Sequence, residues 1–228
     1  MDPFKIDIDN VLTAASLAHQ FFVSKDCYDN VYELSGVARA FIQRCVVGGR
    51  TMSKNNKKYL IRRKIADFDA VSLYPSAMAI LGGFLMGLPK VLEEKQLNLK
   101  FLEKQDGYFI KIKLLKVGIK RDFPLMSKIK KGIRNFTNDM VGDIMYVDKF
   151  FLEDMIKFQG IEFEILQGYF FNEGRNNKIK EVISTIFSER LRFKDNCNQI
   201  ETVYKLIMNS GYGKTLTKPI DTKQVIIH

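Results

Sequence analysis

The feature of the sequence that most limits the fold is a change of hydrophobic period partway along the chain. In segments 110–114 and 161–165 apolar residues alternate with lysine or glutamate, a period of two that predicts half-buried strands. Segments 178–194 and 199–210 instead have the apolar spacing of helices, and a short polar turn separates them. Strands followed by a helical hairpin predict an α+β fold.

Capping residues and glycines predict where several other elements begin and end. Asp148 is a suitable N-cap for a helix that Gly160 ends, and Pro75 begins a short helix that stops at Gly82-Gly83. The remaining expected elements are helices over 11–22 and 37–45, the second ended by Gly48-Gly49, and a strand over 64–71.

Length and composition exclude several classes of protein. The chain has 228 residues, 46% hydrophobic and 27% charged, which fits one large or two small globular domains and not a disordered tail. It has no apolar run of about 18 residues, so we expect no membrane span, and its acidic N-terminus does not resemble a signal peptide. Cys27, Cys45 and Cys197 are far apart, which favours a reducing intracellular compartment over disulfides or a zinc finger.

The net charge of +10 is unevenly distributed along the chain. Segment 51–64 has six basic residues and no acid, and segment 111–134 has nine basic residues against Asp122 alone. Segment 138–173 reverses the balance, with eight acids and two lysines. A solvated surface explains any one cluster, but two basic blocks outside an acidic stretch fit a track for nucleic acid better.

The segment DFDAVSLYPS, residues 67–76, places a carboxylate where a strand is expected to run into a tight turn and a helix. The free N–H groups of the turn and of the helix start can bind a phosphate, and Asp69 can hold a divalent cation beside them. A capping aspartate and a core tyrosine explain the same residues without any ligand.

The segment KLIMNSGYG, residues 205–213, places Lys205, Asn209 and Tyr212 on one face of the expected helix. A cation, an amide and a phenol in this order can contact a triphosphate, a sugar and a base edge. Taken alone, such a lysine is usually just solvated. Three apolar residues lie toward other faces, where we expect them to pack: Val203, Leu206 and Met208.

Together the patterns DxxSLYPS and KxxxNSxYG, in this order, resemble motifs A and B of family B DNA polymerases. Segment 46–50, VVGGR, resembles the YxGG element of the protein-primed branch, with Val46 in place of the usual tyrosine. Segment 122–143 lies where that branch has its terminal-protein-binding insertion. The amino-acid sequences of both motifs are similar to those of polymerases from viruses, virus-like elements and linear plasmids. We therefore expect a gene carried by a virus or mobile element.

The resemblance implies a partial polymerase palm, an antiparallel sheet with helices, followed by helical-hairpin fingers. In this scheme 1–50 is a helical lead-in that ends in the GG element, 51–177 is palm, 178–213 is fingers and 214–228 returns toward the palm. The implied activity is transfer of deoxynucleotides to a primer 3′-hydroxyl with two Mg²⁺ ions. The implied partners are template-primer DNA, deoxynucleoside triphosphates and a terminal-protein primer or a second chain.

The resemblance also implies roles for the residues of motif A. Asp69 would be the catalytic, metal-binding carboxylate, and Asp67 is a secondary candidate because residues two apart share a face of a strand. The amides of Ser72 and Leu73 would hold the triphosphate. Tyr74 would lie under the deoxyribose and exclude a 2′-hydroxyl.

The fingers residues are implied to bind the incoming nucleotide. Lys205 would bind its phosphates with Asn209 in support, while Tyr212 and Gly213 would meet the nascent base pair, because glycine permits close approach. The residues of the GG element that we expect to bind DNA are Gly48, Gly49 and Arg50.

A further phosphate-binding cation is expected near the end of the first fingers helix. Spacing alone does not decide between Arg190, Arg192 and Lys194, and all three also suit a helix C-terminus. We prefer the face that Arg190 and Lys194 share as i, i+4 neighbours.

A complete enzyme of this family has a third motif, YxDTDS, which supplies the second carboxylate. It is not found after Gly213, where segment 214–228 has Asp221 as its single acid, and an exonuclease domain and thumb are not found either. We therefore expect a central fragment that is inactive or nearly so alone, since one carboxylate cannot readily hold two cations about 4 Å apart. Template-dependent incorporation by the purified chain, abolished by Asp69→Ala, would refute this expectation.

Two other classes of function stay open at this point. One is a non-catalytic nucleotide- or nucleic-acid-binding remnant, or one half of a split polymerase, and genomic sequence downstream of His228 would separate these two. The other is a basic structural protein, for which both motifs would have to be coincidental. Weaker triphosphate binding by Lys205→Ala would argue against it.

Overall fold

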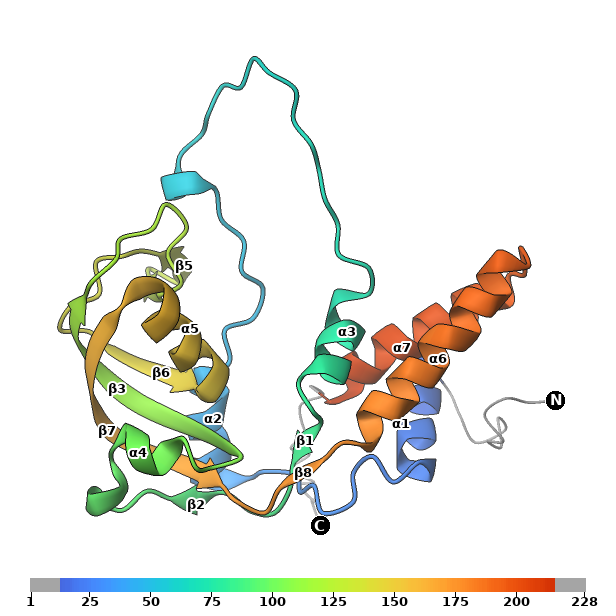
Figure 1. Ribbon diagram of the computed structural model, residues 1–228, viewed down its shortest axis with the longest axis horizontal. Coiled ribbons are helices and arrows are strands. Elements are labelled where there is room, and N and C mark those ends of the chain that lie inside the picture. The colour runs from blue at the N-terminus through green and yellow to red at the C-terminus, as the bar shows by residue number, and fades with distance from the viewer. Residues whose placement is uncertain (1–12, 216–228) are drawn as a thin grey trace, which may run out of the picture. The chain divides into compact units, whose positions relative to one another are not determined.

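A computed structural model describes residues 13–215, and it confirms the α+β class (Figure 1). The chain forms two compact units that interleave along the sequence. Unit 1 combines the chain up to Val31 with Asp67–Phe84 and the chain from Arg175 onward; unit 2 combines Tyr32–Ala66 with Leu85–Gly174. The start of the helix expected over 11–22, most of the return expected over 214–228, and Asp221 lie outside the described residues.

Unit 2 is built on a four-stranded antiparallel sheet of order β2-β7-β3-β6. In that order its strands are Lys90–Val91, Ile161–Phe171, Gly107–Val117 and Ile144–Asp148. The alternation predicted for 110–114 is confirmed, because Ile110, Ile112 and Leu114 are fully buried whereas Lys113 is exposed. The central strand β3 is thus paired along both edges and buried on one face.

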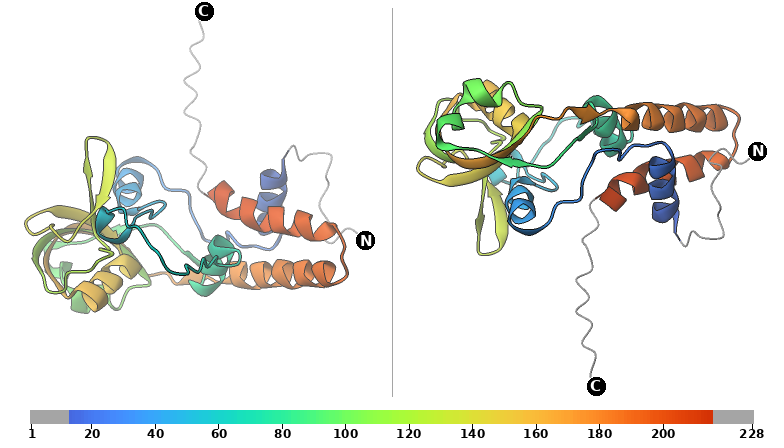
Figure 2. Two further views of the ribbon diagram at one scale, coloured as in Figure 1. Left: turned by 90° about the horizontal axis from the view of Figure 1, so that it is seen from above. Right: turned by 90° about the horizontal axis from the view of Figure 1, so that it is seen from below.

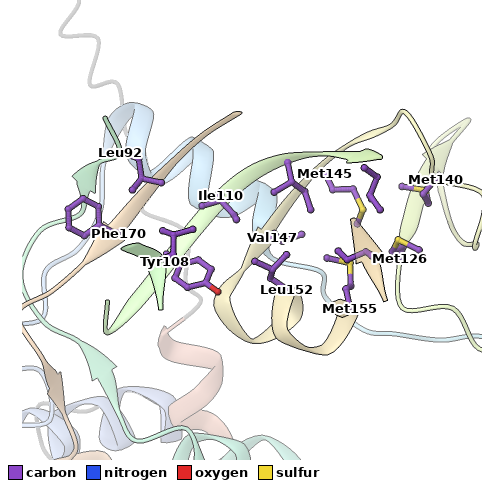
Figure 3. Packing of buried hydrophobic residues seen from close by; sticks show 14 residues of the cluster. Leu92, Tyr108, Ile110, Met126, Met140, Met145, Val147, Leu152, Met155 and Phe170 are labelled. Carbon is purple, nitrogen blue, oxygen red and sulfur yellow. The ribbon is translucent and has the colours of Figure 1, made fainter. Parts of the chain in front are cut away.

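Helix α5 (Lys149–Gln159) supplies part of the core on that face of the sheet, with Leu152 among the fully buried residues (Figure 3). Both of its predicted ends are confirmed. The Asp148 carboxylate accepts a hydrogen bond of 2.7 Å from the N–H of Phe151, and Gly160 ends the helix in the left-handed conformation. Burial raises the pKa of the Asp148 carboxyl above its ordinary value, although the backbone N–H groups that it accepts from oppose this.

Helix α2 (Gly36–Cys45), which agrees with the helix predicted for 37–45, packs on a second, smaller cluster of unit 2. Its Phe41 ring contacts Tyr146 and Tyr169 edge-on, with centroids 5.1 Å away in both cases. These tyrosines lie on the sheet face opposite the Ile110 side chain, because side chains alternate along a strand.

The expected insertion at 122–143 contains a β-hairpin within unit 2. Strands β4 (Ser127–Lys130) and β5 (Ile133–Phe136) pair antiparallel around Lys131 and Gly132, which both have positive φ, as short hairpin turns require. The other short elements of unit 2 are η2 (Lys54–Asn56), η3 (Glu94–Gln96) and α4 (Leu99–Leu102).

Unit 1 is mainly helical, and its two longest helices form the predicted hairpin (Figures 1 and 2). Its elements are α1 (Ala14–Ser24), α3 (Leu73–Ile80), α6 (Lys178–Asp195), α7 (Ile200–Thr215) and β8 (Arg175–Asn176). Strand β8 pairs with β1 (Phe84–Leu85), whose first residue ends segment 67–84 of unit 1 and whose second begins the next segment of unit 2. The core joins α1, α6 and α7 through residues such as Phe22, Ile183 and Ile207. In the described part of the chain, no helix combines the length and apolarity needed to cross a membrane.

The strand predicted for 64–71 is wrong. These residues are exposed and irregular, including Phe68 with 90% of its surface exposed, and none of the described strands pairs with them. A strand is defined by its hydrogen-bonded partner as well as by its sequence, so an apolar segment without a partner does not form one. The chain nevertheless turns into α3 close to where the sequence predicts a helix start.

Candidate functional site

The motif A turn lies in unit 1, directly before α3. Ser72 has φ 47° and ψ 51°, a left-handed conformation that is unfavourable for a residue with a Cβ atom. It occupies the N-cap position, yet its side chain makes no capping hydrogen bond to the described backbone. Helix geometry leaves the N–H groups of Leu73 and Tyr74 without intrahelical acceptors, so the turn presents donors suited to an anion.

Arg190 reaches this turn from α6. One of its terminal nitrogens donates to the Ser72 hydroxyl across 3.2 Å, and its Nε lies 3.2 Å from Oε2 of Glu201 on α7. The Arg190 side chain is only 12% exposed. The hydrogen bond from Arg190 lowers the pKa of the Glu201 carboxyl below its ordinary value.

The other two cations considered at the end of α6 do not reach the motif A turn. Arg192 pairs with Glu189 one turn earlier at 2.6 Å. Lys194 is exposed and has no ion pair or hydrogen bond from its ammonium group within residues 13–215. The structure therefore singles out Arg190 from the predicted face and leaves Lys194 apart from the other motif residues.

The two motif tyrosines lie against each other. The rings of Tyr74 in α3 and Tyr212 in α7 stack at a centroid distance of 4.4 Å and an angle of 9°. Motifs A and B, more than a hundred residues apart in sequence, thus meet in unit 1 through this pair, and Arg190, which precedes motif B, contacts motif A at Ser72.

Helix α7 presents the predicted polar residues, but its buried apolar face matches the expected one only at Met208. Lys205 and Asn209 are exposed, and neither side chain is hydrogen bonded to another residue that the structure describes. Met208 is buried as predicted. The packing predicted for Val203 and Leu206 is wrong, since they are 46% and 52% exposed; Tyr204 and Ile207, which face α1 and α6, pack instead.

The glycines of motif B differ in their surroundings. Gly213 is exposed, and a Cβ atom there would meet open space. Gly211 is buried, and a Cβ atom there would overlap the ring of Phe22 on α1. Close approach of α1 to α7 therefore requires Gly211, a reason for glycine that the sequence pattern did not indicate.

Asp69 and Asp67 lie on the exposed segment before the turn. Among the described residues no three His, Cys, Asp or Glu side chains are grouped so that they could hold a metal ion. A carboxylate three residues before a turn whose amides suit an anion nevertheless fits Mg²⁺ in kind, because that ion is commonly held by one or two carboxylates together with substrate phosphates.

The GG element belongs to unit 2, whereas the residues above belong to unit 1. Gly48 and Gly49 are exposed, and Gly49 has φ 59°. The Arg50 guanidinium donates to the carbonyls of Phe123 and Pro124 in the insertion and lies over the Phe136 ring at 5.3 Å. Desolvation, followed by the charge of Arg121, lowers its pKa.

A groove of about 710 Å³ runs beside the GG element within unit 2. Its walls come from the end of α2, the β4–β5 hairpin and β6. Its charged lining residues are Arg44, Lys128, Lys130, Arg134 and Asp143. Positive charge predominates, which suits a polyanion.

Glu201 is the residue of the site that the motif patterns missed. It lies one helical turn before Lys205 and so shares its face of α7. The i, i+4 spacing was visible in the sequence, but nothing in it indicated which cation of the other helix the carboxylate meets.

Comparisons with known proteins identify a family and a similar fold. Residues 2–228 match the family model described as DNA polymerase type B, organellar and viral. The DNA polymerase of Acidianus bottle-shaped virus (isolate Italy/Pozzuoli) is 26% identical over 189 residues, which cover 76% of this chain. The chain spans about a quarter of that protein, 26% of its length.

Solved structures of Phi29 DNA polymerase have a similar fold. The complex with primer-template DNA matches 90% of this chain at 20% identity and a TM-score of 0.63. The complex with primer-template DNA and incoming nucleotide substrates matches 90% at 20% identity and a TM-score of 0.57. The match covers 35% and 36% of those chains, respectively.

Proposed function

Because the chain belongs to the organellar and viral family of type B DNA polymerases, we propose that unit 1 carries the nucleotide-binding part of a template-directed DNA polymerase. The observation that carries this proposal is the contact of motif A with motif B and with α6: Tyr74 stacks on Tyr212 of motif B, and Arg190 of α6 donates to Ser72. The polymerase of which this chain is part would transfer deoxynucleotides to a primer 3′-hydroxyl. The relative with which it aligns is itself named a viral DNA polymerase, which supports a viral gene.

The triphosphate of the incoming nucleotide would bind at the motif A turn. The amides of Ser72 and Leu73 would donate to its oxygens, and Arg190 and Lys205 would neutralise its charge. Asn209, one turn from Lys205, would support this end of the pocket. Each of these groups is a donor or a cation, as a polyanionic ligand requires.

The aromatic pair would form the floor of the sugar and base site. A Tyr74 ring under the deoxyribose would leave no room for a 2′-hydroxyl and so select deoxynucleotides. Tyr212, which Tyr74 stacks on, and the neighbouring Gly213 would meet the nascent base pair, where the open space at Gly213 permits close approach.

Asp69 is the residue of this chain that would hold Mg²⁺. Such ions, when bound, activate the primer hydroxyl and stabilise the charge that develops on the transferred phosphate. The role of Asp69 itself is to orient the reactive end of the nucleotide beside the turn amides. A second carboxylate, in this polypeptide or in another, would complete a two-metal site.

Unit 2 would contact template-primer DNA. Gly48 and Gly49 offer exposed backbone, and the basic groove beside them suits a phosphate backbone. Arg50 would act by holding the insertion, since its guanidinium bonds to the carbonyls of Phe123 and Pro124. A terminal protein or a second chain would be a further partner, bound at the insertion. The same proposal includes the division of the chain into palm, 51–177, and fingers, 178–213.

A direct test measures dATP binding by the purified chain, for example by calorimetry, with and without Lys205→Ala. We expect the substitution to weaken binding about tenfold or more, because it removes a charge-assisted contact to phosphate. Lys180→Ala is the matched control, since Lys180 is exposed on α6 and has no place in the proposed site.

Equal affinities for the two variants would contradict the fingers assignment, and no dATP binding by the unaltered chain would overturn the proposal for this chain. The alternative, a nucleotide-binding remnant without catalysis, predicts the same binding result. It is favoured over a polymerase segment if Asp69→Ala leaves Mg²⁺-dependent dATP binding unchanged.

A further inference from the structure

The ion pair between Arg190 and Glu201 differs from the other ion pairs of the described residues in its burial. Its side chains are 12% and 27% exposed, whereas those of Lys116 and Glu162 are 63% and 61% exposed. Exposed pairs contribute little, but a partly buried pair that is also hydrogen bonded restricts the position of both groups. Arg190 is therefore held more firmly than the other cations on α6.

Glu201 lies at a position on α7 where a carboxylate is unexpected. It shares the face of Lys205 and Asn209, the face proposed to meet a triphosphate. A carboxylate near a polyanion raises the energy of the complex by like-charge repulsion. A carboxylate at this position therefore weakens nucleotide binding unless it also makes a contact that favours binding.

The geometry around Ser72 points to what Glu201 does. Glu201 accepts from Nε of Arg190, at one edge of the guanidinium. A terminal nitrogen of the same group donates to the Ser72 hydroxyl, at the turn that presents free amides. The planar guanidinium is thus anchored at one edge and directed toward the anion site at another.

We propose that Glu201 is a positioning residue of the nucleotide site, which holds Arg190 toward the motif A turn. This inference rests on the proposed function. A phosphate oxygen of the nucleotide replaces the Ser72 hydroxyl as acceptor, while the bond from Nε to Glu201 persists. Because the side chain is already oriented, little conformational entropy is lost when the nucleotide binds.

The experiment compares dATP affinity of the full chain with Glu201→Gln and with Glu189→Gln, followed by calorimetry. Glu189 is the matched control, because it also pairs with an arginine of α6, but that arginine, Arg192, is 62% exposed. We expect Glu201→Gln to weaken binding about tenfold, and Glu189→Gln to change it by less than about twofold.

The direction in which Glu201→Gln changes dATP affinity distinguishes positioning of Arg190 by Glu201 from simple charge repulsion of the nucleotide. If Glu201 acts only through its charge, Glu201→Gln strengthens binding, and the proposal is wrong. A double variant, Glu201→Gln with Arg190→Gln, distinguishes positioning from a general loss of folding. If Glu201 acts by positioning Arg190, the double variant binds dATP no more weakly than Arg190→Gln alone. Additive losses overturn it, as do equal affinities of Glu201→Gln and Glu189→Gln.

Glu201→Asp, which keeps the charge and shortens the reach to Arg190, is the second variant if the glutamine form is unstable. Positioning predicts weaker dATP binding for it, and unchanged binding overturns the proposal. Measuring Lys205→Ala in the same series distinguishes a failure of the proposed function from a failure of the role proposed for Glu201. If it weakens binding while the Glu201 variants do not, the proposed function stands and the role of Glu201 is refuted.

Discussion

The two units stabilise their segments in different ways. In unit 2 the strand β3 has a partner along each edge and a fully buried row of Ile110, Ile112 and Leu114. In unit 1 the segment that carries Asp69 is exposed and, among the described residues, has no paired strand. The candidate chemical residues of unit 1 thus lie on the motif A turn and on the helices around it, while the four-stranded sheet of unit 2 carries none of the proposed site residues. We therefore expect that substitutions in the sheet change stability and that substitutions around the turn change ligand binding, each largely without the other.

The largest expected effect is from truncation in the sheet core. Ile112→Ala should lower the free energy of unfolding by about 2–5 kcal/mol, because the residue is fully buried. Phe68→Ser is the control and should change it by less than about 0.5 kcal/mol, since Phe68 is 90% exposed. Urea denaturation measures both.

Hydrogen exchange of the same Ile112→Ala variant tests the separation of the units. Protection should fall in β3, β6 and β7 and persist in α6 and α7. An equal loss in both units would mean that they unfold as one and would remove the basis of the comparison.

Gly211→Ala is expected to have an intermediate effect, confined to unit 1. The added methyl overlaps the buried Phe22 ring, and overpacking of this kind costs about 1–3 kcal/mol. Gly213→Ala is the matched control with the opposite sign, because its methyl meets open space and alanine favours a helix by about 1 kcal/mol. Thermal unfolding should rank the variants as Gly213→Ala, unaltered chain, Gly211→Ala; the reverse order would contradict the packing of α1 on α7.

The smallest effect concerns the cap of α5 in unit 2. Asp148→Ala removes the bond to the Phe151 N–H and should cost about 1 kcal/mol. Asp148→Asn keeps a capping oxygen and removes a carboxyl whose pKa is raised in the folded state, so at pH 7 it should be at least as stable as the unaltered chain.

The direction of the stability change expected for Asp148→Asn follows from proton linkage. The folded state binds the proton of Asp148 more tightly than the unfolded state, so the penalty of the ionised form is full above the folded pKa and absent below the unfolded pKa. The advantage of Asp148→Asn should therefore shrink as the pH falls through this window. Urea denaturation at several pH values checks it, and an advantage that grows with acidity would show that the charge stabilises the cap.

Local signals predicted much of the fold. Asp148 and Gly160 marked both ends of α5, and the alternation at 110–114 identified the buried face of β3, because these features depend on neighbouring residues. The strand expected over 64–71 failed because strand formation depends on a partner that sequence pattern does not specify. Val203 and Leu206 were assigned to the wrong face because helical spacing gives faces without saying which one another helix covers.

The candidate site was predictable as a set of residues and less so as an arrangement. The motif patterns identified Ser72, Tyr74 and Tyr212, which the fold brings together with Arg190. They did not indicate that Arg190 meets Glu201, because that pair depends on how α6 packs against α7. The metal-binding role of Asp69 stays a prediction.

The interleaving of the units has a consequence for synthesis. Lys178 at the start of α6 pairs with Asp26 just after α1, 152 residues earlier. At a ribosomal rate of about 5–20 residues per second, α1 is made roughly 8–30 s before that partner exists. All of unit 2 is made in that interval, since it ends at Gly174. The sheet can therefore fold as it emerges, while Phe22 and its neighbours on α1 must wait for the last helices, and the order of translation becomes an order of folding.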